Sequence, residues 1–192
     1  MDNSSSVPVR VLFVCLGNIC RSPSAENIFR HLVKTKGLDS HFECDSCGTG
    51  AWHAGESPHP KALATARKRN IPMTGRARAL RDQDVQRFDY ILAMDRSNLR
   101  DVQELVSRHK SRNDNNSDKP KVELLLKYAK NKSRAEECHW EVPDPFYGFL
   151  SGGVYGGDEE FEFVFDLLED ACEGLLETII RSKGWNVPSG KA

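Results

Sequence analysis

The N-terminal part of the sequence passes from a short apolar segment through a tight loop into an amphipathic helix, and few folds accommodate that order. Residues 9–15 (VRVLFVC) are rich in Val, Leu and Phe without strict alternation, as in a strand buried on both faces. Ser22 and Pro23 then resemble a helix start, apolar residues continue at helical spacing to Val33, and Gly37 closes the segment. The order predicts strand, loop and helix.

Strand and helix candidates alternate along the rest of the chain. Further strands are predicted at residues 42–46, 88–94 and 122–126, and helices at residues 60–69, 97–106 and 159–183. A helical interpretation of residues 122–128 competes with the last strand, and residues 108–119 are predicted to form a polar loop. Alternating strands and helices predict an α/β fold with a parallel sheet covered on both faces. Ligands bind at the carboxyl ends of strands in such sheets, which is where Cys15 lies.

The bulk composition is that of an ordinary globular chain. With 192 residues, 39% apolar content and a formal net charge of −1, we expect one domain at residues 9–185 between a flexible tail at 1–8 and a tail at 186–192. The charge predicts no nucleic-acid partner, and no apolar run suggests a membrane span. The N-terminus lacks a secretory signal, so we expect a cytoplasmic location, free thiols at the six cysteines and no metal site.

The loop CLGNICRS places Cys15 at the end of the predicted strand and Arg21 six positions later. A loop that wraps onto a helix N-terminus directs backbone N–H groups at one point, and the helix dipole adds positive potential there. These features favour a bound phosphate and the thiolate form of the cysteine. The other residues of the predicted phosphate-binding loop are Leu16, Gly17, Asn18, Ile19, Cys20 and Ser22.

Each polar or small residue of this loop suits a specific task. The planar guanidinium of Arg21 can hold two phosphate oxygens, which a lysine cannot do. Gly17 and Asn18 tolerate the positive φ angles that a tightly curled loop requires. The hydroxyl group of Ser22 is placed to donate to the sulfur of Cys15. The loop therefore predicts a nucleophilic cysteine that attacks a phosphate held by Arg21.

These residues belong to a wider pattern that resembles the low-molecular-weight protein tyrosine phosphatase family. The blocks that carry the resemblance are VLFVCLGNICRSPSAE, DSCGTGAWHAGE, FDYILAMDRSNLRDV and VPDPFYG. The resemblance implies a three-layer sandwich in which helices flank a four-stranded parallel sheet, with the phosphate-binding loop after the first strand. It also implies an enzyme without a cofactor that hydrolyses phosphotyrosine in proteins, or small aryl phosphates, through a phosphocysteine intermediate and releases inorganic phosphate.

Asp144, between two prolines, is the candidate general acid. A thiolate that attacks a phosphate ester must expel an alkoxide or phenolate, which leaves poorly unless it is protonated. Flanking prolines stiffen the backbone of a side chain that must be aimed, although Pro-Asp-Pro is equally a rigid surface turn. The match of DPFYG to the acid loop of the family assigns the acid role to Asp144, and then the base role toward the hydrolytic water.

The same resemblance assigns supporting roles to five further residues. Trp52, Phe146 and Tyr147 match the apolar walls that flank the substrate ring, and a deep slot of this kind favours phosphotyrosine over the shorter phosphoserine. Ser46 matches the position that holds the loop in shape. Asp95 matches a position linked to the loop arginine, although an Asp after a strand is also a common helix cap.

The chain departs from the animal members of the family in three places. Arg69 and Gly75 align with two histidines, so the histidine contribution to activating the thiol is missing or is replaced by Arg69. Phe146 and Tyr147 stand in place of a tyrosine pair, which removes one of two phosphorylation sites. The glycines of residues 149–157 suggest a mobile flap at the cleft mouth or a plain loop insertion.

Three other functions stay open on this sequence. Thiol-dependent arsenate reductases use the same scaffold but need a close pair of redox cysteines, whereas Cys138 and Cys172 are widely separated. Bacterial relatives that hydrolyse phosphoarginine carry Thr where this chain has Ile19. A non-catalytic phosphotyrosine-binding module would be expected to lose one of the three predicted catalytic residues, and all three are present.

Cys20 carries a separate prediction. It lies in the same tight loop as Cys15, at a position where the family has a second cysteine. We expect oxidation of Cys15 to be trapped as a Cys15–Cys20 disulfide, which would protect the sulfur from irreversible oxidation. The alternative is that Cys20 only packs beneath the loop.

Overall fold

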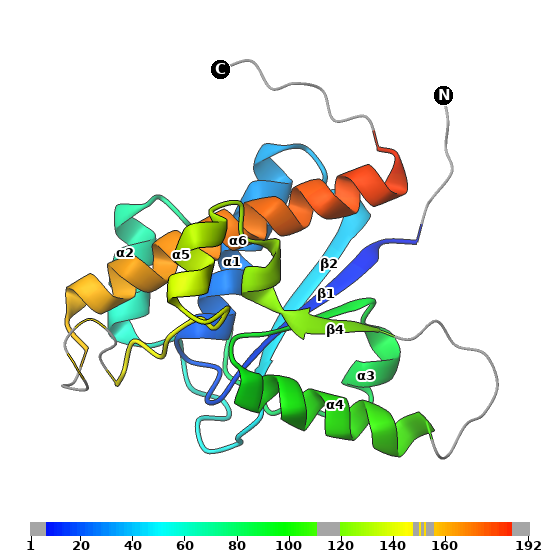
Figure 1. Cartoon of the computed structure of the whole chain (residues 1–192), viewed down its shortest axis with the longest axis horizontal. Helices are drawn as coiled ribbons and strands as arrows, with labels where there is room; N and C mark the ends of the chain where they lie inside the picture. The colour runs from blue at the N-terminus through cyan, green and yellow to red at the C-terminus, as the bar shows by residue number, and fades with distance from the viewer. Residues whose placement is uncertain (1–6, 111–119, 148–149, 151, 153–155, 186–192) are drawn as a thin grey trace.

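The structure of the protein, a computed structural model, describes residues 7–110, 120–147, 150, 152 and 156–185. Its sheet has the strand order β2-β1-β3-β4, and all neighbouring strands are parallel. The strands are β1 (Val9–Cys15), β2 (Phe42–Gly48), β3 (Tyr90–Ala93) and β4 (Lys121–Leu124). The predicted four-stranded α/β fold is confirmed, with the loop that contains Cys15 directly after β1 (Figure 1).

Four longer helices account for most of the layers around the sheet. They are α1 (Arg21–Thr35), α2 (Pro60–Lys68), α4 (Arg96–Lys110) and α6 (Asp158–Lys183). The shorter helical segments are η1 (Asp39–His41), α3 (Asp84–Arg87), η2 (Leu125–Tyr128) and α5 (Lys132–Glu137). The sequence pattern predicted the four longer helices to within a few residues. It missed η1, α3 and α5, because segments this short carry too few residues for a periodic signal.

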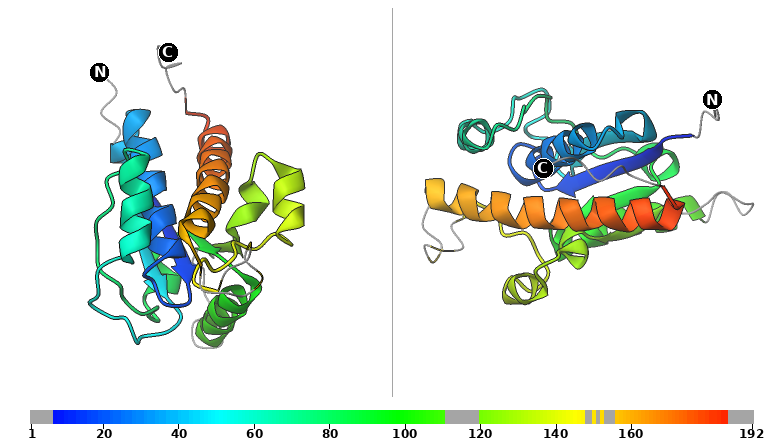
Figure 2. Two further views of the ribbon diagram at one scale, coloured as in Figure 1. Left: turned by 90° about the vertical axis from the view of Figure 1, so that its left-hand side faces the viewer. Right: turned by 90° about the horizontal axis from the view of Figure 1, so that it is seen from above.

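Strand β1 lies inside the sheet, and its side chains alternate between two apolar layers. Val11 and Phe13 pack in the larger core with residues of α1 and α6. Leu12 and Val14 face the other way and pack with residues of α3 and α4. All four side chains are fully buried, which explains the continuous apolar run in the sequence. Figures 1 and 2 show the three layers, with α6 and α4 on opposite sides of the strands.

Three boundaries differ from the prediction for local reasons. Helix α1 begins at Arg21 and its N-cap is Cys20, so Ser22 lies inside the helix and is not its cap. The strand predicted at 88–94 is limited to β3, and the last predicted strand ends at Leu124, where a 3₁₀ helix takes over. Both interpretations of that last segment therefore hold in part. Gly184 closes α6 in the left-handed conformation.

Several predictions concern segments outside the described residues. Residues 1–6, 111–119 and 186–192 and most of 149–157 fall there, so the domain boundaries, the polar loop and the flap stay predictions. Within the described part of the chain, no helix combines the length and hydropathy that a membrane span requires. In the same residues, no group of three or more His, Cys, Asp or Glu side chains is arranged to hold a metal ion.

Gly174 on α6 provides a test of the packing between α6 and η2. A Cβ atom at this position would lie 1.9 Å from the carbonyl oxygen of Tyr128, which belongs to the backbone and cannot rotate away. Ala normally stabilises a helix interior by about 0.5–1 kcal/mol relative to Gly. Here we expect Gly174→Ala to lower the free energy of unfolding by about 1–3 kcal/mol, because the two segments must separate. Urea unfolding measures this, and an unchanged or raised midpoint would contradict the close approach.

Candidate active site

The loop of residues 15–21 lies at the carboxyl edge of the sheet, beside the end of β3. Strand β1 continues through α1 to β2 on one side, whereas β3 continues through α4 to β4 on the other. Ligands of open α/β sheets bind where the strand connections diverge in this way. A third segment reaches the same place, because the Val142 N–H donates to the Met94 carbonyl oxygen at 2.7 Å. The fold thus joins three distant parts of the chain at one edge.

Cys15 ends β1 with only 2% of its surface exposed. The hydroxyl oxygen of Ser22 lies 2.9 Å from the sulfur, and the backbone N–H of Asn18 donates to the sulfur at 3.2 Å. Helix α1 begins within the same loop, so its N-terminal end is directed at this region. Hydrogen-bond donors and a helix N-terminus suit a sulfur that carries negative charge. The predicted contact between Ser22 and Cys15 is present.

Asn18 holds the loop together from its centre. Its φ angle is +55°, the left-handed conformation expected for it. Its Nδ2 donates to the hydroxyl oxygens of Ser46 and Ser22, at 2.9 Å each, and its Oδ1 accepts from the backbone N–H of Arg78 at 2.8 Å. The predicted pairing of Ser46 with Asn18 is therefore present. The sequence did not indicate Arg78, which lies 60 positions away and contributes a backbone group.

Gly17 serves a purpose other than the predicted one. Among the described residues, the positive φ angle of this pair belongs to Asn18 and not to Gly17. A Cβ atom on Gly17 would lie 3.0 Å from Cδ2 of His53, so the missing side chain lets the imidazole ring approach the loop. Nδ1 of His53 lies 2.9 Å from a carboxylate oxygen of Glu56. The sequence analysis missed His53, although its position next to Trp52 was the available signal.

Arg21 links the loop to two other segments of the site. It is buried, its Nη1 donates to Asp95 at 2.7 Å and to the Val142 carbonyl oxygen at 3.2 Å, and its Nη2 donates to Asp144 at 2.8 Å. Burial alone would lower the pKa of this guanidinium, but the negative charges of Cys15, Asp144 and Asp95 raise it overall. Asp95 also accepts from the backbone N–H of Asn98, so it both caps α4 and holds Arg21.

Asp144 lies in the irregular segment between α5 and α6. One carboxylate oxygen accepts from Arg21, and the other accepts from the backbone N–H of Phe146 at 3.1 Å. The carboxyl group is about a quarter exposed, since 24% of its side-chain surface is accessible. The structure thus brings Asp144 to the loop that contains Cys15, across more than 120 positions of sequence, and leaves it open to an incoming molecule.

The three predicted aromatic residues border the loop from two segments. Phe146 and Tyr147 follow Asp144 directly, and their rings meet edge to face with centroids 5.7 Å apart. Trp52 lies on a segment tied to the loop by the bond from the Gly50 N–H to the Leu16 carbonyl oxygen. All three residues are exposed, Trp52 by 67%, Tyr147 by 65% and Phe146 by 42%. They are therefore surface aromatics and not part of the core.

Arg69 does not replace a histidine near the thiol. Its guanidinium forms ion pairs with Glu162, Asp166 and Glu169, all on α6. Although partial burial acts against the charged form, the hydrogen bonds that Arg69 donates to these carboxylates raise its pKa. The charge of Arg69 is therefore committed to the contact between α2 and α6. Activation of Cys15 by the loop itself stays a prediction.

Comparison with known proteins extends over almost the whole chain. The model of the family "Low molecular weight phosphotyrosine protein phosphatase" matches residues 10–184. The low molecular weight phosphotyrosine protein phosphatase of Schizosaccharomyces pombe is 40% identical over 172 residues, which cover 89% of this chain and 97% of that protein.

Solved structures share the fold as well. The structure of YfkJ from Bacillus subtilis has a TM-score of 0.75 and 36% sequence identity, and the match covers 93% of this chain and 98% of that one. The structure of a Drosophila arginine phosphatase has a TM-score of 0.72 and 29% identity, with 88% of this chain and 96% of that chain covered. The four-stranded sheet and the loop after its first strand belong to a fold that these proteins share.

Proposed function

The chain belongs to the low molecular weight phosphotyrosine protein phosphatase family, and we propose that it hydrolyses phosphotyrosine in proteins and small aryl phosphates. The observation that carries the assignment of the residues is the set of contacts around Arg21. This guanidinium donates a hydrogen bond to Asp144. The loop that carries Arg21 begins at Cys15, whose sulfur is buried. Nucleophile, phosphate-binding cation and proton donor are thereby adjacent, as a two-step phosphoryl transfer requires.

In the first step the Cys15 thiolate attacks phosphorus. A sulfur–phosphorus bond forms, the bond from phosphorus to the tyrosine oxygen breaks, and Asp144 gives its proton to the leaving oxygen. Arg21 and the backbone N–H groups of the loop hold the phosphoryl oxygens and stabilise their charge. The phosphoryl group competes with Asp144 for Nη2 of Arg21, whereas Asp95 keeps Nη1 in place. This exchange frees the carboxyl group to face the leaving oxygen.

In the second step water hydrolyses the phosphocysteine. The Asp144 carboxylate takes a proton from the water, whose oxygen attacks phosphorus while the sulfur–phosphorus bond breaks. Inorganic phosphate leaves and Cys15 returns to the thiolate form. The Ser22 hydroxyl, whose oxygen lies 2.9 Å from the sulfur, can donate a hydrogen bond to the departing thiolate. No metal or organic cofactor takes part in this proposed sequence.

The aromatic residues support tyrosine as the substrate side chain. Phe146, Tyr147 and Trp52 stand exposed beside the loop, where a flat ring can lie against them. The reductase alternative is disfavoured, because both Cys138 and Cys172 are buried and burial raises the pKa of each thiol. Ile19 argues against the phosphoarginine alternative, because bacterial relatives that hydrolyse phosphoarginine carry Thr there, whereas the resemblance to a Drosophila arginine phosphatase favours it.

Substrate comparison tests this proposal. With a phosphotyrosine peptide we expect kcat/KM to exceed that for a phosphoarginine peptide by about 100-fold, because the apolar walls and Ile19 favour a flat ring over a guanidinium. Ile19→Thr should lower this ratio of the two kcat/KM values. Initial rates of phosphate release measure both, and arsenite formation from arsenate in the presence of a thiol measures the reductase. Faster hydrolysis of phosphoarginine, or arsenate reduction at a comparable rate, would overturn the substrate assignment.

The Cys15–Cys20 disulfide stays a prediction. Both thiols are free and buried in this structure. Burial, and then the negative charges of Asp144 and Cys15, raise the pKa of Cys20 well above that of an ordinary thiol. Cys20 is therefore protonated at neutral pH, so a protective disulfide would form more slowly than with an activated partner.

A further inference from the structure

A continuous series of hydrogen bonds runs from the sulfur of Cys15 to a carboxylate on helix α1. Ser22 contacts the sulfur at 2.9 Å, Asn18 contacts Ser22 and Ser46, and the Ser46 hydroxyl donates to Oε2 of Glu26 at 2.6 Å. Ser22, Ser46 and Asn18 were expected to support the loop. Glu26, one turn after Ser22 on α1, was not.

The contacts indicate the direction of the hydrogen bonds at Ser46 and Asn18. Ser46 has a single proton, which it gives to Glu26, so it presents only lone pairs to Asn18. The side-chain amide of Asn18 must therefore turn its Nδ2 toward Ser46 and Ser22. Ser22 accepts from Asn18 and keeps its own proton for the sulfur of Cys15 or for the Cys47 carbonyl oxygen at 3.2 Å.

The opposite orientation of the amide would reverse this outcome. With Oδ1 turned toward the serines, the hydroxyl groups of Ser22 and Ser46 would both donate to Asn18, and Ser22 would have no proton left for the sulfur. Two independent contacts oppose that orientation. The backbone N–H of Arg78 requires Oδ1 on its side, and Glu26 removes the proton of Ser46.

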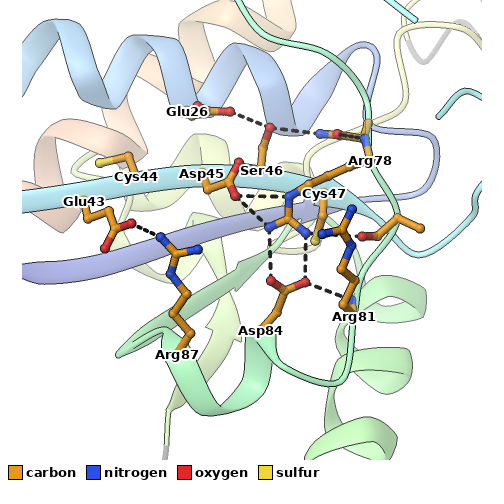
Figure 3. A network of polar contacts seen from close by, with 12 residues as sticks. Glu26, Glu43, Cys44, Asp45, Ser46, Cys47, Arg78, Arg81, Asp84 and Arg87 are labelled. Carbon is orange, nitrogen blue, oxygen red and sulfur yellow. Dashed lines mark hydrogen bonds and ion pairs between the residues drawn. The ribbon is translucent and has the colours of Figure 1, made fainter. Parts of the chain in front are cut away.

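Arg78 and Glu26, the two residues that orient the Asn18 amide, are each held by further contacts. Figure 3 shows Arg78 between Asp45 on β2 and Asp84 on α3, and Ser46, on the same strand as Asp45, pointing toward Glu26. The guanidinium of Arg78 lies 2.8 Å from Asp45 and 2.9 Å from Asp84. Glu26 is only 9% exposed. Burial raises the pKa of its carboxyl group, whereas the Ser46 bond and Arg30, at 2.8 Å, favour its charged form.

The charged and titratable groups that face Glu26 come from three elements. Arg30 lies one turn further along α1, and Cys44 and Asp45 lie on β2. Arg76, from the segment before Arg78, lines the same cavity of about 270 Å³ as Glu26. One oxygen of the Glu26 carboxylate pairs with Arg30. The other accepts from the Ser46 hydroxyl and thereby connects Glu26 to the loop.

We propose that Glu26 is a positioning residue for catalysis, which orients the Asn18 amide through Ser46 and so directs the Ser22 hydroxyl to the Cys15 sulfur. The proposal rests on the proposed phosphocysteine chemistry but acts on the thiolate before any substrate binds. Its effect is therefore measurable as the reactivity of Cys15 toward a small alkylating agent. That measurement does not depend on phosphatase activity.

The test compares Glu26→Leu, Glu26→Gln and the matched control Glu43→Leu. Glu43 lies on the same strand as Ser46 but pairs with Arg10 and Arg87. We expect Glu26→Leu to slow alkylation of Cys15 by iodoacetate at about pH 6 by about three- to tenfold. This is the effect expected when the thiolate loses one hydrogen bond. Glu26→Gln keeps an acceptor for Ser46 and should stay within about twofold of wild type, as should Glu43→Leu.

A double-mutant cycle separates positioning from general loosening of the fold. Ser46→Ala should slow alkylation to the same extent as Glu26→Leu, and the double variant should lose no more than either alone. The same order should hold for kcat/KM on an aryl phosphate. The proposal would be overturned if folded Glu26→Leu were alkylated at Cys15 as fast as wild type, or if the losses of the two single variants added up in the double variant. If the alkylation rates followed the expected order but the wild-type protein hydrolysed no aryl phosphate, the proposed function would be refuted and the positioning role would stand.

Discussion

Replacement of Cys15 by serine is expected to abolish hydrolysis of aryl phosphates, with kcat lower by about 10⁴-fold or more. A serine hydroxyl is ionised to a negligible extent at neutral pH, and the contacts around Cys15 supply donors rather than a base. Ser22 and the Asn18 N–H both lie within hydrogen-bond distance of the sulfur, and both stabilise a negative charge that the hydroxyl does not carry. Release of nitrophenolate from nitrophenyl phosphate measures the loss directly.

Two controls make this result specific to the nucleophile. Cys138→Ser changes another buried cysteine, outside the site, and should retain activity. The Cys15→Ser protein should still bind inorganic phosphate in a calorimetric titration, because Arg21 and the backbone N–H groups of the loop are unchanged. Appreciable turnover by Cys15→Ser would contradict a phosphocysteine intermediate and would end the proposed mechanism.

Asp144→Ala is expected to lower kcat by about 10²–10³-fold on phosphotyrosine, the usual contribution of a positioned general acid. The loss should depend on the leaving group. Nitrophenolate departs with little need of a proton, so the same variant should lose much less of its rate of phosphocysteine formation on nitrophenyl phosphate. Rapid-quench measurements of phosphoenzyme on both substrates would show this difference.

The Asp144 contacts suggest a variant that isolates the proton. Asp144→Asn keeps the size of the side chain and one oxygen, which can accept from either Arg21 or the Phe146 N–H but not from both, and it has no acidic proton to donate. It should resemble Asp144→Ala in rate, whereas Asp82→Ala, at an exposed ion pair with His109, should resemble wild type. An equal loss on both leaving groups would assign Asp144 a structural role instead of an acid role.

The sequence predicts the parts of this site that are local in the chain. The strand before Cys15, the curled loop and the helix after it lie in one stretch, so apolar content, residue type and spacing are enough to place them. Residue type was nevertheless misleading in detail, since Ser22 resembles a cap and is instead a contact of the sulfur.

The remaining parts depend on tertiary structure that no local pattern encodes. Asp144 reaches Arg21 from an irregular segment, and only its resemblance to a known motif indicated it. Arg78 acts through a backbone N–H, which any residue type possesses. Glu26 shows no special pattern either, because a single Glu on a helix is usually a solvated charge and its burial against Ser46 becomes evident only in the fold.

The separation of the nucleophile from the acid has a consequence for how such enzymes diversify. Cys15 ends a strand that is paired on both sides, so substitutions near it endanger the whole fold. Asp144 lies on an irregular connection, where insertions and deletions are tolerated far better. The segment with Asp144, which meets the leaving group, can therefore change in length and sequence while the phosphate-binding loop after β1 is kept. A change of substrate on this scaffold is then a matter of loop exchange, and the bond-making machinery is inherited without alteration.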